Sequence, residues 1–335
     1  MVCNKAGDLA DTLQKMKVKV LVQRLHPWRK IIMIIFRYLY AWKLHRLTRK
    51  LGIRLIHCCD LWLGGYAFRL AGQLKVPLIL HVRRPLSPRD IGKFNCSAAA
   101  RLVPISKRIR ENLLIAGIPA EKIMQIDDSV DTQLFSAQYA ANILRREYSP
   151  IGEILIGIVG RIDAFKRQLD FLKAAVIVLR RCSRPVTFFV IGEVHSRHYF
   201  HKMQRFIREN DIDRHVIFTD RREDMPAVIS SLDILVTLSG GSVMFEAMAA
   251  GKAVVSAGFT TKKFACHLQD GVTGLLIESQ QPADLADALI KLIENPRLRE
   301  HLGINARQWA LKELTHTKMA AKTQQLYDTL LGKYK

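Results

Sequence analysis

Short apolar runs alternate with longer amphipathic segments along most of this chain. The apolar runs predict strands at 18–22, 55–57, 77–82, 101–105 and 123–126 in the first half, and at 154–159, 186–191, 216–218, 234–238, 253–255 and 275–277 in the second. The predicted helices are 65–74, 107–116, 166–181, 198–209, 224–230, 243–250, 283–293, 296–313 and 316–334. This alternation predicts an α/β fold of two doubly wound, Rossmann-like domains facing a cleft, with ligands at the carboxyl ends of the strands.

The best candidate linker is 148–152, where proline and glycine interrupt the pattern near the middle of the chain. The expected division is therefore an N-terminal α/β domain at 1–149 and a second α/β domain at 150–315. A terminal amphipathic helix at 316–335 follows them.

The stretch 239–256 carries the clearest chemistry. Gly240 and Gly241 allow a tight turn after the preceding strand, because glycine adopts backbone conformations that a Cβ forbids. Ser242 is expected to cap a short helix that Gly251 ends. A helix N-terminus that directly follows a strand presents free N–H groups and the positive end of a dipole, which suits a phosphate.

Glu246 lies one turn inside this helix and needs an explanation of its own. A capping-box acid belongs three residues after the cap, and Phe245 occupies that place. Two interpretations remain: an ordinary solvated glutamate, or a carboxylate that accepts hydrogen bonds from sugar hydroxyls.

Two cations follow the first strand of the second half. Gly160 and Arg161 end the strand 154–159, and Lys166 opens the next helix. An arginine grips phosphate oxygens in a bidentate pair, while a lysine supplies a compact point charge. Combined with Glu246, these cations predict a diphosphate attached to a sugar. The alternative is that they are ordinary surface residues of a basic protein.

The chain of 335 residues has a formal net charge of +22, which predicts an anionic partner such as a nucleotide, a phosphorylated glycan, an anionic lipid surface or nucleic acid. Residues 1–60 contain thirteen Lys or Arg against three Asp. Within them, the stretch 24–50 mixes aromatic and basic residues as membrane-interface helices do, and its apolar run 31–36 is too short to span a bilayer. A core helix with a basic outer face is the alternative. Nucleic acid is the least favoured partner, because no recognised binding motif accompanies the aromatics.

The sequence predicts no metal site and no cofactor. Its six cysteines contain no CxxC pair, and without a secretory signal they are expected to be free thiols in the cytosol. Asp211 and Asp213 match the DxD pattern of some metal sites, but they lie just before a strand, where a polar loop is expected. His195 and His198 lack neighbours at ligand spacing. The expected location is cytoplasmic. Peripheral attachment to the inner face of the cytoplasmic membrane is a second, separate expectation.

Several segments resemble the signatures of the large retaining group 1 glycosyltransferase family. They are 159–166, 246–255 and 270–277 and, less specifically, 106–110 and 118–123. The resemblance covers residues 50–330. It implies the two-domain GT-B fold, a nucleotide sugar held mainly by the second domain, and a last helix that packs back on the first domain.

The resemblance also implies roles. Arg161 and Lys166 would hold the diphosphate and Glu246 the ribose, and these three are the candidate catalytic residues. The full set of candidate nucleotide-sugar contacts is Gly160, Arg161, Lys166, Gly241, Ser242, Val243 and Glu246. The implied reaction moves a sugar to an acceptor hydroxyl with retained anomeric configuration. Fixed cations would stabilise the charge that grows on the leaving nucleotide, without a metal.

Acceptor-side candidates come from strand ends in the first domain. They are Asp60, Gly64, His81 and Arg83. A satisfied structural histidine is the ordinary explanation of His81. The expected acceptor is a cell-envelope polysaccharide, a lipopolysaccharide or a glycolipid, because a basic first domain favours an anionic surface.

Two departures from the family pattern bear on activity. A second glutamate usually precedes the helix glutamate by eight residues, and here that place is Leu238, with the non-acidic Ser239 beside it. Family members also commonly begin with a strand and a glycine-rich loop before the region resembling 7–14, so the first strand is expected to be missing or to lie upstream. A non-catalytic relative that binds nucleotide or glycan is therefore the alternative function. A GT-B sugar-nucleotide epimerase is less favoured, because further cleft acids and histidines cannot be assigned.

Overall fold

The computed structural model consists of two compact units, Met1–Ile126 with Lys322–Lys335, and Asp127–Ala321. It describes residues 1–4, 6–26, 28, 34–136, 142–149, 154–257, 267–277, 279 and 281–333. The division falls after Ile126, whereas the sequence pattern places it after residue 149. The physical reason is that Val130, Phe135 and Leu144 are buried in an apolar cluster of the second unit. The expected linker at 148–152 lies partly outside the described residues.

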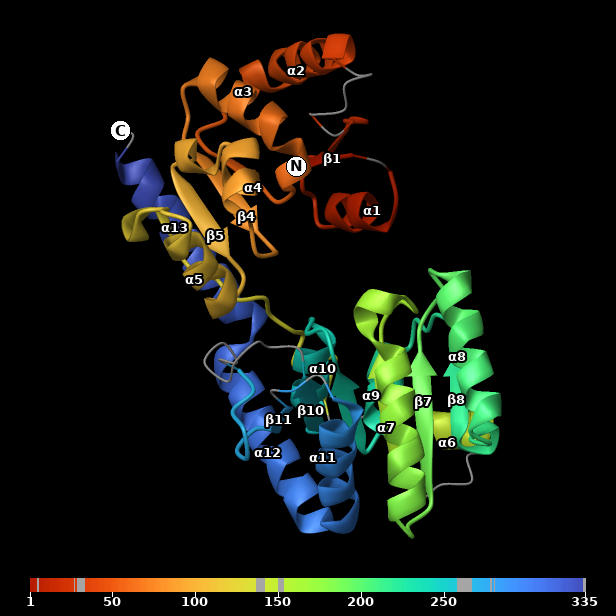
Figure 1. The fold of residues 1–335 in the computed structure, drawn as a ribbon. Coiled ribbons are helices and arrows are strands. Elements are labelled where there is room, and N and C mark those ends of the chain that lie inside the picture. The colour runs from red at the N-terminus through yellow and green to blue at the C-terminus, as the bar shows by residue number, and fades with distance from the viewer. Residues whose placement is uncertain are drawn as a thin grey trace. The chain divides into compact units, whose positions relative to one another are not determined.

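The second unit is built on six parallel strands in the order β11–β10–β9–β6–β7–β8 (Figure 1). Their bounds are β6 Ile154–Val159, β7 Val186–Ile191, β8 Val216–Thr219, β9 Ile234–Thr237, β10 Ala253–Ala257 and β11 Leu275–Ile277. Every residue of β7, β9 and β10 is buried, as expected for parallel strands that are covered on both faces. The α/β class predicted from the alternating pattern is confirmed.

Two layers of helices cover this sheet. On one face lie α7 (Gln168–Arg181), α8 (Arg197–Glu209) and α11 (Pro282–Glu294). On the other lie α6 (Ile143–Tyr148), α9 (Met225–Ser231), α10 (Val243–Ala249) and α12 (Pro296–Glu313). Side chains of β6 alternate between the layers, with Ile154 and Ile156 in the first cluster and Leu155 in the second.

The first unit contains a second parallel sheet, β3–β4–β5. Its strands are β3 Ile56–Cys58, β4 Leu78–Val82 and β5 Arg101–Pro104, and its helices include α3 Gly64–Leu74, α4 Pro88–Lys93 and α5 Lys107–Ile115. The last helix, α13 (His316–Lys333), belongs to both units. From Lys322 onward it is part of the first unit, where Leu326 and Leu330 are buried.

The N-terminal region differs most from the sequence prediction. The expected strand 18–22 is reduced to β2 (Leu21–Val22), which pairs in parallel with the unexpected strand β1 (Val2–Cys3). Helix α1 (Asp8–Lys15) connects them. The expected strand 123–126 forms a single bridge, between Ile123 and Leu102. Two-residue strands carry too little alternation to be recognised from sequence.

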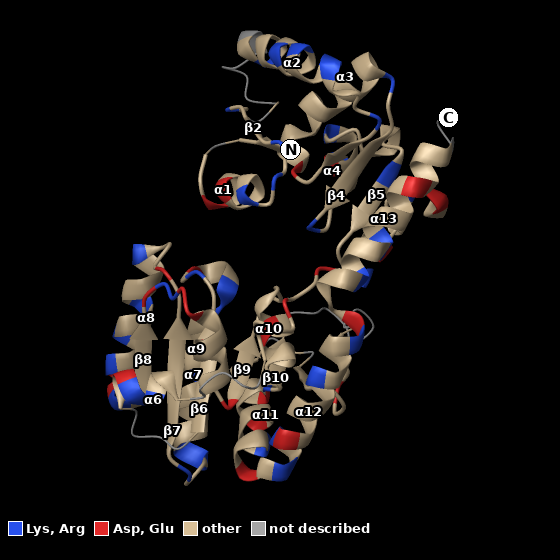
Figure 2. Ribbon diagram, turned by 180° about the vertical axis from the view of Figure 1, so that it is seen from behind, with Lys and Arg blue, Asp and Glu red and all other residues tan. Residues whose placement is uncertain are grey.

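The basic aromatic stretch contains helix α2 (Ile34–Thr48), whereas residues 27 and 29–33 lie outside the description. One side of α2 is in the core, where Ala41 packs with Tyr66 of α3. Phe36, Leu39 and Trp42 on the same helix are 49%, 56% and 57% exposed. Figure 2 shows Lys and Arg residues on this helix as well. Among the described helices, none is long and apolar enough to cross a bilayer.

Close backbone packing sets the position of α10. A Cβ on Gly303 of α12 would lie only 2.2 Å from the carbonyl oxygen of Gly251, the residue with positive φ that follows α10. Gly303 therefore allows α12 to approach the end of α10 more closely than any other residue would permit.

This packing predicts the sign of two glycine substitutions. Gly303→Ala should lower the free energy of unfolding by roughly 1–3 kcal/mol, because the added methyl group overlaps the Gly251 carbonyl. Gly72→Ala is the matched control in α3, where an added Cβ meets nothing within 4 Å, and should raise stability by roughly 0.5–1 kcal/mol through helix propensity. Urea unfolding followed by circular dichroism measures both. Stabilisation by both substitutions would contradict the close contact.

Candidate functional site

The strand order of the second unit creates an opening at the carboxyl ends of β6 and β9. These strands are neighbours, yet β6 leads into α7 on one face of the sheet and β9 leads into α10 on the other. Ligands of doubly wound sheets bind at such a topological switch point. Gly160 and Arg161 follow β6, and the turn Ser239–Gly241 follows β9. Two segments that the sequence pattern selected separately are thus side by side.

Lys166 bridges these two segments. A Cβ built on Gly160 would lie 3.3 Å from Cδ and Cε of Lys166, so the lysine stem runs along the backbone of Gly160. The ammonium nitrogen of Lys166 lies 3.8 Å from the position that a Cβ of Gly241 would take. Both glycines have positive φ, 147° and 130°. The absence of their side chains leaves the backbone of both turns open to a ligand.

Asp163 orders the loop that carries both cations. Its carboxylate accepts a hydrogen bond from the backbone N–H of Lys166 at 3.1 Å and lies 3.8 Å from Nη2 of Arg161. The Arg161 side chain is 62% exposed and remains available to solvent. Burial lowers the pKa of Lys166, Asp163 opposes this shift, and the neighbouring charge of Arg161 adds to it. An anion bound between the two cations would relieve their repulsion.

The helix after the glycine turn begins as predicted, but the predicted side-chain cap by Ser242 is wrong. Ser242 directly precedes α10 in helical geometry, and its hydroxyl accepts no hydrogen bond from the first turn. The N–H of Val243 is one of the donors that an α-helix leaves without an internal acceptor. Gly241 and Ser242 are both exposed. The start of α10 is therefore accessible beside Lys166.

Glu246 is half-buried on α10 between buried apolar neighbours, and burial raises its pKa. No side chain in the described part of the chain donates a hydrogen bond to its carboxylate. A half-buried, ionised carboxylate costs stability unless another group donates hydrogen bonds to it. The interpretation of Glu246 as an ordinary solvated residue does not fit this burial.

Leu238 occupies the position where the family pattern has its first glutamate. Its side chain is 3% exposed and belongs to the apolar cluster under α7 and α11. The next residue, Ser239, places its hydroxyl 3.4 Å from the carbonyl oxygen of Gly240. This side of the turn therefore presents no carboxylate.

A cavity of about 280 Å³ at the ends of β6 and β7 adds residues that the sequence reasoning missed. Its lining consists of Val159, Gly160, Arg161, Ile191, Gly192, Glu193, Arg221, Arg222 and Met225. Arg222 is fixed there by Glu147 and Asp224, at 2.5 and 2.7 Å, and these partners raise its pKa. The pair Arg221 and Arg222, separated by two residues from the end of the predicted strand 216–218, was the signal that could have identified this edge of the site.

The acceptor-side candidates all lie in the first unit. Asp60 accepts a hydrogen bond from the N–H of Trp62 and so caps a short 3₁₀ turn, which is a structural role. Gly64 has free space where its Cβ would be, whereas a Cβ on Gly65 would lie 2.1 Å from the Trp28 ring. Of these two glycines, Gly65 is the one required for packing.

His81 and Arg83 lie at the carboxyl end of β4. The imidazole of His81 stacks on that of His57 with ring centroids 5.3 Å apart. Burial, the His57 ring and the Arg83 charge lower the pKa of His81 to about 4. Arg83 is exposed. Sequence reasoning found His81 but missed the histidine that stacks against it.

The two metal patterns considered from sequence lie on the surface. Asp211, Asp213, His195 and His198 are all exposed. None of them is part of the one group of potential metal ligands found among the described residues.

Comparison with known proteins identifies similar sequences across both units. The family described as glycosyl transferases group 1 matches residues 142–309, half of the chain, and glycosyltransferase family 4 matches residues 1–134. The alpha-D-kanosaminyltransferase of Streptomyces kanamyceticus is 25% identical over 291 residues, 78% of this chain and 73% of that protein. The D-inositol 3-phosphate glycosyltransferase of Corynebacterium glutamicum is 26% identical over 223 residues, 63% of this chain and 53% of that protein.

Solved structures share the fold. The crystal structure of Anabaena HepE in complex with UDP and glucose has a TM-score of 0.81 at 19% identity, and the match covers 98% of this chain and 90% of HepE.

The burial of Glu246 predicts a pH-dependent effect on stability. A raised pKa means that the folded protein keeps this proton to higher pH than the unfolded chain does, so stability falls as the pH rises from the ordinary glutamate value of 4.5 through the raised pKa. Glu246→Gln should therefore be more stable than the wild type at pH 7 without ligand, and the difference should vanish near pH 4. Thermal unfolding across this pH range measures it.

Glu147→Gln is the matched control. Arg222 lowers the pKa of the Glu147 carboxyl, so removing this charge should destabilise the protein at pH 7. If Glu246→Gln instead destabilises the protein as Glu147→Gln does, the carboxylate of Glu246 has a stabilising partner within the protein, and the explanation from burial is wrong.

Proposed function

The chain belongs to the group 1 glycosyltransferases, and we propose that it transfers a sugar from a nucleotide sugar to an acceptor hydroxyl with retained anomeric configuration. Its α/β units have the GT-B fold. The observation that carries the proposal is the convergence of Lys166, Gly160 and Gly241 at the switch point of the second unit.

The diphosphate of the donor binds at this convergence. Arg161 and Lys166 provide two positive charges, and the start of α10 at Ser242 and Val243 provides backbone donors beside them. Glu246 then accepts hydrogen bonds from the ribose, which supplies donors to its half-buried carboxylate. The complex of HepE with UDP supports a nucleoside diphosphate as the ligand.

Charge stabilisation is the catalytic contribution of this site. As the bond between the sugar C1 and the diphosphate oxygen breaks, negative charge grows on the leaving nucleotide. Arg161 and Lys166, fixed before the reaction begins, stabilise that charge at the place where it develops. The transfer requires no metal at the diphosphate.

The acceptor is anionic or is presented at an anionic surface, as in the synthesis of envelope polysaccharide, lipopolysaccharide or glycolipid. The relative from Corynebacterium glutamicum is named for a phosphorylated acceptor, which supports this class. The net charge of +22 favours the same chemistry. His81 and Arg83 at the end of β4 are the proposed acceptor-side residues, and Asp60 contributes by capping the adjoining 3₁₀ turn.

Leu238 supports a second candidate, a protein that binds nucleotide without turnover. An apolar, buried side chain where the family has a carboxylate removes one contact to the donor sugar. The two functions differ in one measurement: both predict nucleotide binding, and only the first predicts transfer or hydrolysis of the sugar.

Substitutions at the switch point should weaken nucleotide binding. Arg161→Ala, Lys166→Ala and Glu246→Ala are each expected to reduce the affinity for UDP or GDP by roughly 10- to 150-fold, because each loses a hydrogen bond to a charged group. Isothermal titration calorimetry measures this loss. Arg184→Ala is the matched control, since Arg184 is exposed and lies ahead of β7, at the opposite end of the strands.

Unchanged affinity in all three variants would contradict the proposed site. Release of labelled sugar from a panel of nucleotide sugars then separates turnover from binding alone.

We further propose that α2 attaches the protein to anionic membrane surfaces. Phe36, Leu39 and Trp42 expose apolar area, and Lys43, Arg46, Arg49 and Lys50 supply positive charge on and after the same helix. Arg46 lies 5.5 Å from the Trp42 ring, so basic and aromatic groups are intermixed. Interfacial helices combine apolar insertion with attraction to anionic lipid in this way.

The paired substitution Phe36→Ser with Trp42→Ser should abolish cosedimentation with vesicles of phosphatidylcholine and phosphatidylglycerol, while the positive charge is retained. Ile304→Ser, at a residue that is 49% exposed in the second unit, is the control and should bind like the wild type. Wild-type protein that stays in solution with these vesicles at low salt would show that the exposed face of α2 has another role.

A further inference from the structure

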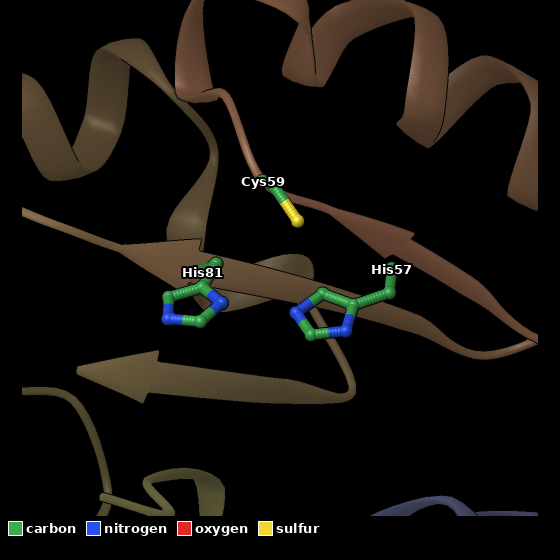
Figure 3. A group of neighbouring side chains, drawn as sticks. All are labelled: His57, Cys59 and His81. Carbon is green, nitrogen blue, oxygen red and sulfur yellow. The ribbon is translucent and has the colours of Figure 1, made fainter. Parts of the chain in front are cut away.

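Three potential metal ligands converge at the carboxyl ends of β3 and β4. One donor atom from each of His57, Cys59 and His81 lies within 4.8 Å of the other two. Figure 3 shows the sulfur of Cys59 beside the two imidazoles, which present ring nitrogens toward each other. The proposed diphosphate site is in the other unit, so Arg161 and Lys166 are not part of this group.

The register of the parallel strands explains the convergence. His57 pairs with Ile79 and Cys58 with Leu80, which brings Cys59 level with His81. Since strand side chains alternate with a period of two, Cys59, directly after the end of β3, is on the same face as His57, and His81 shares that face on β4. Two sequence segments more than twenty residues apart thus supply one compact donor set.

Two ring nitrogens of this group have no hydrogen-bond partner in the part of the chain that the structure describes. They are Nε2 of His57 and Nε2 of His81, both buried, whereas Nδ1 of His57 is 2.8 Å from the hydroxyl of Tyr327. In the tautomer in which Nδ1 carries the proton, Nδ1–H donates a hydrogen bond to the hydroxyl of Tyr327, and Nε2 presents a lone pair. This arrangement matches the way metal-binding histidines are oriented by a hydrogen bond on the other ring nitrogen.

We propose that His57, Cys59 and His81 bind a zinc-class divalent cation. The ligands are Nε2 of His57, a ring nitrogen of His81 and the thiolate of Cys59, and a fourth position remains for water or an anion. Two imidazoles and a thiolate suit zinc and cobalt better than magnesium or calcium, which prefer oxygen ligands. Tetrahedral zinc places neighbouring ligand atoms about 3.5 Å apart, so small side-chain rotations close the group around the metal.

Charge balance is consistent with this assignment. The thiolate of Cys59 compensates one of the two positive charges of the metal. Cys59 is exposed, which gives the metal a path from solvent. The bound metal would connect the ends of β3 and β4 and, through Tyr327, the last turns of α13.

Cobalt titration of the reduced, tag-free protein tests the proposal. Co²⁺ should bind one equivalent per chain and produce the near-ultraviolet absorption of a cobalt–thiolate bond, together with visible bands of tetrahedral cobalt. Zn²⁺ should displace it and raise the melting temperature. Cys59→Ser should abolish the thiolate absorption and weaken Zn²⁺ binding more than about 100-fold.

Two further variants separate a site from general affinity for metals. Tyr327→Phe should weaken binding by about 10- to 100-fold and keep the cobalt–thiolate absorption, because the hydroxyl only orients His57. Cys182→Ser, in the other unit, should bind like the wild type. Absence of the thiolate absorption in the wild type, its persistence in Cys59→Ser, or equal Zn²⁺ affinity in all variants would each overturn the proposal. None of these readouts depends on sugar transfer.

Discussion

Parallel strands that are neighbours in a sheet, but lead into helices on opposite faces, leave space at the end they share. In this protein the strands are β6 and β9, and the helices are α7 and α10. A side chain that follows one strand can then reach the turn that follows the other, as Lys166 reaches toward Gly241. The opening beside Lys166 and Gly241 depends on this divergence of the two helices.

Backbone contacts without intervening side chains hold this arrangement in place. A Cβ on Gly192 would lie 2.2 Å from the carbonyl oxygen of Gly160, so the turns after β7 and β6 touch directly. Gly303 and Gly251 make the equivalent contact behind α10. The turn that carries Arg161 and the helix that carries Glu246 are therefore each fixed by a glycine from a neighbouring segment, and Asp163 adds the side-chain contacts that order the loop of Arg161 and Lys166.

The sequence predicted the second unit well because its strands are long, apolar and buried on both faces. The bounds of β6, β7 and β11 agree with the expected residues. Glu246 was recognisable because helix capping could not explain it. The stacking of His57 on His81 was not predictable, since it depends on the register between β3 and β4, which the chain pattern does not specify. The boundary between the two units, which lies after Ile126, was missed for a similar reason. Val130 and Phe135 follow no regular period, yet they are buried with the second unit.

The shared helix α13 makes the first unit discontinuous along the chain. Met1–Ile126 leaves the ribosome first, whereas Leu326, Tyr327 and Leu330 are synthesised only after the whole of Asp127–Ala321. The second unit, continuous in sequence, is able to complete its core as it emerges. Until Leu326 and Leu330 are synthesised, the apolar surface of the first unit that they cover in the folded protein is exposed to water. Translation order therefore allows the second unit to mature earlier than the first, whose core is completed only when the last turns of α13 are added.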